Sequence, residues 1–134
     1  IRNKISKDLS FTKEDRIENI RRVSEIAKLF VDAGIITIVA LISPFKAERH
    51  QAKSKFEKNK FFEIFINTSL KTTMKRDPKK LYEKTIKGEV KNMTSISSPY
   101  EPPEKPFIEI KTEKISAQDA ARKIVSKLRS INAI

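Results

Sequence analysis

The chain has 134 residues, enough for one domain with one hydrophobic core. It has no cysteine, which excludes disulfides and cysteine-based zinc sites and fits a reducing compartment such as the cytoplasm. Lysine and arginine total 29 against 17 acidic residues, and the net charge of +12 attracts polyanions. Glutamates lie among these lysines, so much of the charge is typical of a solubilising surface. The longest apolar run, residues 35–42, is far shorter than the roughly 20 residues that span a membrane.

The first predicted element is a long amphipathic helix. Thr12, followed three residues later by Asp15, is a capping-box-like start. Apolar residues then recur at helical spacing, namely Ile17, Ile20, Val23, Ala27, Phe30 and Val31. Gly34 ends the helix, because glycine readily adopts the left-handed conformation that follows a last turn. The apolar and mostly β-branched residues 35–42 predict a strand buried on both faces of a parallel sheet, which Ser43-Pro44 ends.

The middle of the chain alternates helices and a strand. Residues 46–58 predict a polar helix, and residues 61–68 predict a second buried strand. A short helix is expected over 69–75 and another over 79–87, and a glycine ends the latter. The dipeptide Asp77-Pro78 separates the two, because the residue before a proline disfavours helix.

A long irregular segment precedes the last strand. Residues 89–106 show no period and hold four prolines, and a loop of that length is usually functional or disordered. Residues 107–112 predict a third strand, and Ser116 with Asp119 predicts the cap of a last helix. The inner face of that helix is expected to be Ala120, Ala121, Ile124, Val125 and Leu128. The alternation predicts a layered α/β domain with a parallel sheet, which binds ligands beyond the carboxyl ends of its strands.

The residue inventory argues against several kinds of active site. His50 is the single histidine and lies on a charged helix, so we interpret it as an ordinary surface residue. It supports no Ser/His/Asp set, no carboxylate pair suits glycoside hydrolysis, and no metal-ligand spacing is present. The sequence also has no glycine-rich phosphate loop.

Short motifs nevertheless follow one another from residue 1 to about residue 128 in a specific order. They are Ile1-Arg2, residues 8–11, Asp15-Arg16, residues 18–22, residues 27–34, residues 42–45, Glu48-Arg49, residues 76–79, Leu81-Tyr82, residues 88–91 and residues 98–104. Together they resemble the adenylylsulfate kinases, which transfer the γ-phosphate of ATP to the 3′-hydroxyl of adenosine 5′-phosphosulfate. The resemblance implies ATP and Mg²⁺ as cofactors.

This resemblance implies a P-loop nucleoside-triphosphate hydrolase or kinase-like fold, a three-layer parallel sheet with helices on both faces. In the family the first strand, the phosphate loop, its lysine and the acidic residue beside Mg²⁺ all precede the position of Ile1. We therefore expect residues 1–134 to be a single kinase domain that lacks its N-terminal part, inactive by itself. Residues 76–106 are expected to form a lid that covers the substrate and excludes water.

The resemblance also implies which residues bind the sulfated nucleotide. Arg2, Arg16 and Asn19 match residues that grip its phosphosulfate and ribose, and a guanidinium suits a dianion because its donors lie in a fixed plane. Arg16 and Asn19 taken alone would be interpreted as surface residues of an amphipathic helix. Phe11 matches a phenylalanine that stacks on adenine, although a ring in that position can equally be a hydrophobic staple.

Further implied contacts come from the end of the strand predicted over residues 35–42 and from the lid. Ile42 and Ser43 match a substrate-contacting pair, and Ser43 is the serine sometimes described as a phosphorylated intermediate. Direct in-line transfer needs no such covalent step. Lys79 matches a lysine that reaches the reacting phosphates or the substrate. Asn92 and Met93 belong to the lid, and Met93 replaces the usual second stacking aromatic, which predicts looser adenine binding.

The implied ATP contacts lie later in the chain. Arg76 matches a basic residue near the ATP base and lid, and Thr112 and Ile115 lie where the family lines its adenine pocket. Ser10, Lys80 and Ser95 occupy positions where glycine is usual, which stiffens those turns or, where positive φ is required, strains them.

Two other functions stay open at this point. One is a non-catalytic, nucleotide-sensing kinase-like domain of a sulfate adenylyltransferase, which could retain the same binding residues. The other, from net charge alone, is a nucleic-acid-binding protein, which the interleaved acidic residues and the lack of a known module argue against. We expect neither nucleic acid nor membrane as a partner, and a homodimer as the assembly. The sequence does not decide between a stand-alone kinase and one fused to a sulfate adenylyltransferase.

Overall fold

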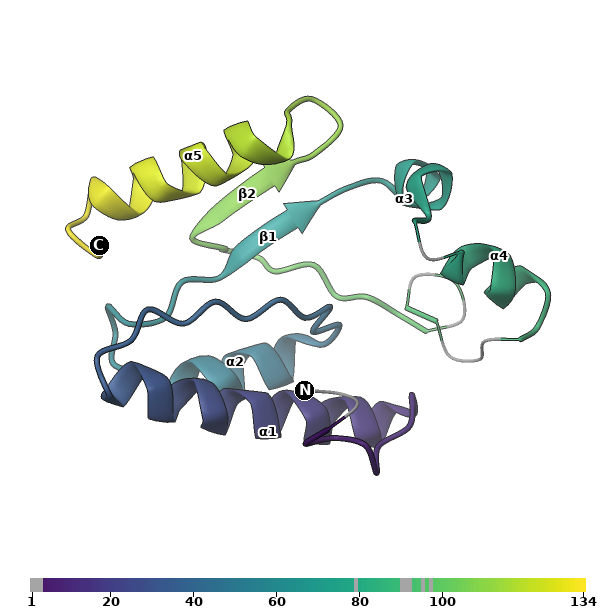
Figure 1. The fold of residues 1–134 in the computed structure, drawn as a ribbon, viewed down its shortest axis with the longest axis horizontal. Coiled ribbons are helices and arrows are strands. Elements are labelled where there is room, and N and C mark those ends of the chain that lie inside the picture. The colour runs from purple at the N-terminus through teal and green to yellow at the C-terminus, as the bar shows by residue number, and fades with distance from the viewer. Residues whose placement is uncertain (1–3, 79, 90–92, 95, 97) are drawn as a thin grey trace. The chain divides into compact units, whose positions relative to one another are not determined.

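The computed structural model describes residues 4–78, 80–89, 93–94, 96 and 98–134. Predictions for Arg2, Lys79, Asn92 and Ser95 therefore fall outside the described residues. The chain divides into two compact units, residues 1–58 with 90–102 and residues 59–89 with 103–134. In chain order the elements are α1 (Lys13–Asp32), α2 (Lys46–Ser54), β1 (Ile64–Asn67), α3 (Leu70–Arg76), α4 (Leu81–Ile86), β2 (Ile108–Lys111) and α5 (Ala117–Arg129), as labelled in Figure 1.

Helix α1 is the main element of the first unit, and its predicted ends are confirmed. The Thr12 side chain accepts a hydrogen bond from the Asp15 amide at 3.2 Å. At the other end Gly34 has a φ of +79°, the left-handed conformation expected after a helix. Ile20, Val23 and Ala27 are buried, and α1 packs against α2. The predicted apolar face is wrong at Phe30, which is 48% exposed.

The strand predicted over residues 35–42 is absent. The segment has no regular secondary structure, and Ile36 and Ile38 are 73% and 91% exposed. A strand is stabilised by a ladder of hydrogen bonds to a neighbour, and within the described residues only β1 and β2 form a sheet. The apolar, β-branched composition of the segment is therefore not sufficient to make it a strand.

Helix α2 is shorter than the predicted helix over residues 46–58. It ends at Ser54, where the Lys55 and Phe56 amides donate to the carbonyls of Ala52 and Lys53 and tighten the last turn. Its N-cap residue, Phe45, is buried and makes no side-chain capping bond.

The second unit contains the sheet, and the predicted parallel pairing is confirmed. Strands β1 and β2 run parallel, with Ile64 opposite Ile108 and Asn67 opposite Lys111. Ile108 and Ile110 are buried, and Figure 1 shows α5 lying along this sheet. Strand β1 is shorter than the predicted 61–68. The prediction of a buried strand is wrong for β1, because Ile66 is 55% exposed.

Helix α5 covers the sheet with a narrower face than predicted. Ser116 caps it by accepting from the Asp119 amide at 3.1 Å, as expected. Ala120 is buried and Ile124 packs against the same core, whereas Ala121 and Val125 are exposed. Residues four apart lie on one face of a helix, whereas a one-residue step turns the side chain by about 100°. The predicted inner face is thus wrong at these two positions.

Between the strands, α3 and α4 are joined at Asp77. The Asp77 carboxylate accepts from the amides of Leu81 and Tyr82 at 2.8 and 3.0 Å, which caps α4 and starts it later than the predicted residue 79. Lys80 has a φ of +52°, so the strain expected at this position is present, whereas Ser10 has no positive φ. Gly88, at +78°, ends the helix region as predicted.

Candidate nucleotide-binding site

The first turn of α1 places a cation beside an exposed aromatic ring. The Arg16 Nε donates to the carbonyl oxygen of Phe11 at 3.1 Å, and the guanidinium carbon lies 5.9 Å from the centre of the Phe11 ring. The Arg16 Nη1 donates to the Thr94 hydroxyl at 2.6 Å. Phe11 is 56% exposed. Such a ring can stack on a base, and the adjacent guanidinium can bind an anion.

One helical turn further on, Asn19 presents a buried oxygen with no partner. The residue is 8% exposed, and its Oδ1 accepts no hydrogen bond from any described residue. An unpaired buried acceptor costs about 1–3 kcal/mol, and such groups are rare in native proteins. Arg16 and Asn19 lie three residues apart, so their side chains project from the same side of α1.

Ser43 follows the irregular segment that replaces the expected strand. Its φ is +45°, in the left-handed region that a serine rarely occupies. Its carbonyl accepts from the Arg49 Nη1 at 2.7 Å, and its neighbour Ile42 is 63% exposed. Unusual backbone conformations cluster at binding sites, where the surroundings hold them in place.

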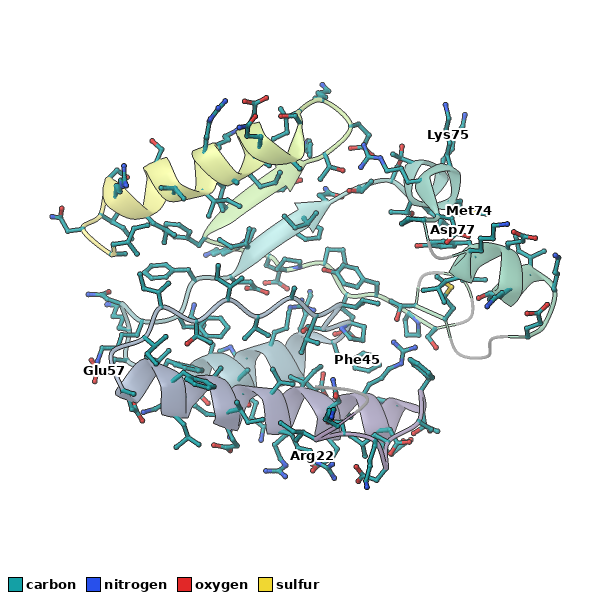
Figure 2. The ribbon with its side chains drawn as sticks, in the orientation of Figure 1. Arg22, Phe45, Glu57, Met74, Lys75 and Asp77 are labelled. Atoms are coloured by element: carbon teal, nitrogen blue, oxygen red, sulfur yellow. The ribbon has the colours of Figure 1, made fainter. Side chains whose placement is uncertain are left out.

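A separate charge network anchors the turn that precedes the site. Arg22, marked on α1 in Figure 2, donates to both Asp8 carboxylate oxygens at 2.7 Å and to the Ile5 carbonyl at 2.9 Å. The hydrogen bonds from Arg22 lower the pKa of Asp8. The hydrogen bonds from Arg21 and Arg22 lower the pKa of Glu18 to about 2. Arg21 and Arg22 are thus engaged by carboxylates of the scaffold.

The second unit brings together two of the three residues predicted to contact ATP. The Arg76 Nη1 and Nη2 donate to the Thr112 hydroxyl and carbonyl, both at 2.9 Å. The Thr112 and Thr68 hydroxyls lie 2.5 Å apart, just beyond the carboxyl ends of β2 and β1. Ile115, in contrast, packs against the core formed by Ile108 and Ile110.

Beside this group, Glu113 joins the two strand ends. Its carboxylate accepts from the Ser69 amide at 2.6 Å, and this bond lowers the pKa of Glu113. The position agrees with the rule that parallel sheets bind ligands beyond their carboxyl ends.

Sequence reasoning missed the residues that hold these side chains in place. Thr94 supports Arg16 from 78 positions away, and Arg49 and Glu101 meet across 52 positions. Arg49 and Glu101 lie in matched motifs and Thr94 follows Met93, but residue types alone do not reveal contacts at such separations. Met93, beside Thr94, is partly buried.

The described residues contain neither a cluster of metal ligands nor a membrane-spanning helix. Among them no three His, Asp or Glu side chains gather closely enough to hold a metal ion. None of the described helices has the length and hydropathy needed to cross a bilayer.

Comparison with known proteins gives matches along most of the chain. The family model of adenylylsulphate kinase matches residues 1–111. The adenylyl-sulfate kinase of Clostridium acetobutylicum is 48% identical over 129 residues, covering 96% of this chain and 64% of that protein. The bifunctional enzyme NodQ of Rhizobium sp. (strain BR816) is 51% identical over 112 residues, covering 84% of this chain and 18% of that protein. The chain thus spans less than two thirds of these relatives.

A solved structure supports the same relationship. The Mycobacterium tuberculosis APS kinase in complex with AMPPNP and APS matches with a TM-score of 0.89 and 35% sequence identity, over 96% of this chain and 75% of that one. This likeness confirms the predicted fold class, an α/β P-loop kinase fold with a parallel sheet.

Proposed function

The chain belongs to the adenylylsulfate kinase family, and we propose that the whole protein transfers the γ-phosphate of ATP to the 3′-hydroxyl of adenosine 5′-phosphosulfate. The product would be 3′-phosphoadenosine 5′-phosphosulfate, the activated sulfate donor. The observation that best supports this proposal is the buried Oδ1 of Asn19, which has no hydrogen-bond partner among the described residues and lies one turn from Arg16. A sulfated nucleotide offers both groups what they need, a hydroxyl donor and an anion.

On this proposal the first unit binds the acceptor nucleotide. Arg16 pairs with the phosphosulfate, the Asn19 Oδ1 accepts from a ribose hydroxyl, and Phe11 stacks on the adenine. Ile42, Ser43 and Met93 add contacts along the nucleotide, as do Arg2 and Asn92, which lie outside the described residues.

The second unit contributes to ATP binding in the same proposal. Arg76 and Thr112 approach the ATP base, and Ile115 shapes that region from the core side. The relative from M. tuberculosis was solved with AMPPNP, an ATP analogue, which supports ATP as the donor. Residues 76–106 act as the lid, and Lys79 within it reaches the reacting phosphates.

The chemistry asked of these residues is positioning and charge neutralisation. Phosphoryl transfer passes through a loose transition state, so in-line alignment of the hydroxyl and the γ-phosphate supplies most of the rate. When bound with ATP, Mg²⁺ would neutralise charge on the triphosphate. Ser43 serves as a substrate contact in this scheme, because direct transfer requires no phosphoserine.

We also propose a cytoplasmic homodimer. The absence of cysteine supports a reducing compartment. Fusion to a second enzyme is an alternative arrangement, which the resemblance to a bifunctional relative supports.

The proposal is tested with the full-length natural protein, ATP, Mg²⁺ and adenosine 5′-phosphosulfate. We expect a 3′-phosphorylated product, and we expect Arg16→Ala to remove most activity while the fold persists. Arg122→Ala is the matched control, because Arg122 is an exposed arginine of α5 that pairs with Asp119, three residues before it. A folded protein that binds the nucleotide without forming product would instead be a nucleotide sensor.

A further inference from the structure

The side chain of Arg49, which has no role in the proposed function above, holds the left-handed turn at Ser43. We infer that Arg49 is a positioning residue for the acceptor nucleotide and acts through the backbone of Ser43. The inference rests on the proposed function, because it takes Ile42 and Ser43 as contacts of that nucleotide.

The Arg49 guanidinium joins two backbone segments. Its Nη1 donates to the Ser43 carbonyl and its Nη2 donates to the Glu101 carbonyl, both at 2.7 Å. Its central carbon lies 5.8 Å from the centre of the Tyr100 ring, within range of a cation–π contact. One rigid, planar cation thus links the turn before α2 to residues 100–101. We call this arrangement of Arg49 and Glu101 the clasp.

Glu101 closes the clasp from the other side. Its amide donates to the Pro44 carbonyl at 2.8 Å, and its carboxylate accepts from the Lys46 amide at 2.7 Å. The second bond replaces the missing cap of α2, since Phe45 offers no side-chain acceptor. A carboxylate at a helix N-terminus is favoured by the exposed amides and the helix dipole. The segment that follows Ser43 is therefore tied to Glu101 at two positions, Pro44 and Lys46. Pro44 and Phe45 are themselves buried.

The clasp matters because Ser43 would not adopt its conformation unaided. Its φ of +45° is disfavoured for any residue with a Cβ. Without the bond from Arg49, the backbone of Ser43 is free to relax to a negative φ. That rotation would carry the side chains of Ile42 and Ser43 away from the nucleotide. Lysine would not replace arginine here, because a single ammonium lacks the planar fork that reaches both carbonyls.

The test compares the full-length protein with Arg49→Ala and Arg49→Lys. Adenosine 5′-phosphosulfate binding is measured by calorimetry, steady-state kinetics are measured for both substrates, and the melting temperature is recorded. We expect Kd and KM for adenosine 5′-phosphosulfate to rise about tenfold in Arg49→Ala, the loss of one charge-assisted hydrogen bond. Arg49→Lys should show most of that rise, and KM for ATP should stay unchanged in both. Arg122→Ala serves as the control for removal of a surface arginine.

A second variant separates positioning from general support. Glycine tolerates positive φ, so a protein with Ser43→Gly should no longer need Arg49 to hold the turn. Adding Arg49→Ala to Ser43→Gly should therefore raise the Kd for adenosine 5′-phosphosulfate by much less than the tenfold expected when Arg49→Ala is added to the wild type. The inference is overturned if Arg49→Ala raises the Kd equally with and without Ser43→Gly. It is also overturned if Arg49→Ala lowers the melting temperature and weakens the binding of ATP and of adenosine 5′-phosphosulfate equally, because Arg49 would then have a purely structural role. If Arg49→Ala does not fold, Arg49→Lys decides by the same Kd.

Measurements on the wild-type protein separate a failure of the proposed function from a failure of the role inferred for Arg49. If wild type neither binds nor phosphorylates adenosine 5′-phosphosulfate, the proposed function fails and the inference fails with it. If wild type does both and Arg49→Ala binds equally well, only the role of Arg49 is refuted.

Discussion

Replacing Asn19 with leucine should raise stability and lower nucleotide affinity at the same time. Asn19 lies on the buried face of α1 and is 8% exposed, yet its Oδ1 has no hydrogen-bond partner among the described residues. Leucine has a similar size and no polar atom, so it can fill the same space without the unpaired acceptor. The change therefore removes a cost to folding and a proposed contact to the ribose together.

The expected size of both effects, on stability and on affinity, follows from the Oδ1 atom of Asn19. An unsatisfied buried acceptor costs about 1–3 kcal/mol, and for a chain of this length each kcal/mol moves the melting temperature by about 4 °C. Asn19→Leu should thus melt about 4–12 °C higher than wild type. Binding of adenosine 5′-phosphosulfate should weaken by about tenfold, since a donor of the ligand then meets an apolar group.

Thermal unfolding and calorimetric titration with adenosine 5′-phosphosulfate measure the two effects. Ser24→Ala is the matched control, because Ser24 is also buried on α1 but its hydroxyl already donates to the Arg21 carbonyl at 2.7 Å. That control should lose about 1 kcal/mol of stability and no affinity. The reasoning is refuted if Asn19→Leu lowers the melting temperature and leaves the affinity intact, because the amide would then be a structural group.

Three further predictions concern stability. Ile110 is 1% exposed in the core of the second unit. In urea unfolding, Ile110→Ala should lower the free energy of unfolding by about 2–5 kcal/mol and Ile110→Val by about 0.5–1.5 kcal/mol. Equal losses in the two variants would contradict close packing around Ile110. The pKa of Glu18 lies near 2 in the folded protein, below its ordinary 4.5, so its stabilising effect is full above about pH 4.5 and is lost as the pH falls toward 2. In Glu18→Gln the melting temperature should therefore fall less steeply than in wild type between pH 5 and pH 2.5. An equally steep fall would exclude Glu18 as the source of this pH dependence. Lys80→Gly should gain about 0.5–1 kcal/mol by relieving a φ of +52°, whereas Lys80→Ala should gain nothing.

Helix ends are the part of this fold that local sequence predicted best. Thr12, Ser69 and Ser116 each accept from an amide three residues further along. Such a bond forms within one turn and needs nothing from the rest of the chain. Gly34 and Gly88 likewise adopt positive φ because they lack a Cβ, wherever the neighbouring elements lie.

Strands and the candidate site depend on groups that are distant in sequence. Residues 35–42 have the composition of a strand, yet they form none, because a strand exists only with a partner and no described segment pairs with them. The amino-acid order by itself determined the family resemblance, the capped helices and the residue types available to bind a nucleotide. Only the tertiary structure decided that Arg16 meets Thr94, that Asn19 keeps an unpaired oxygen and that Ser43 is left-handed. The physical reason is that burial, long-range hydrogen bonds and imposed backbone conformations arise from chain segments far apart in sequence, which local propensity does not encode.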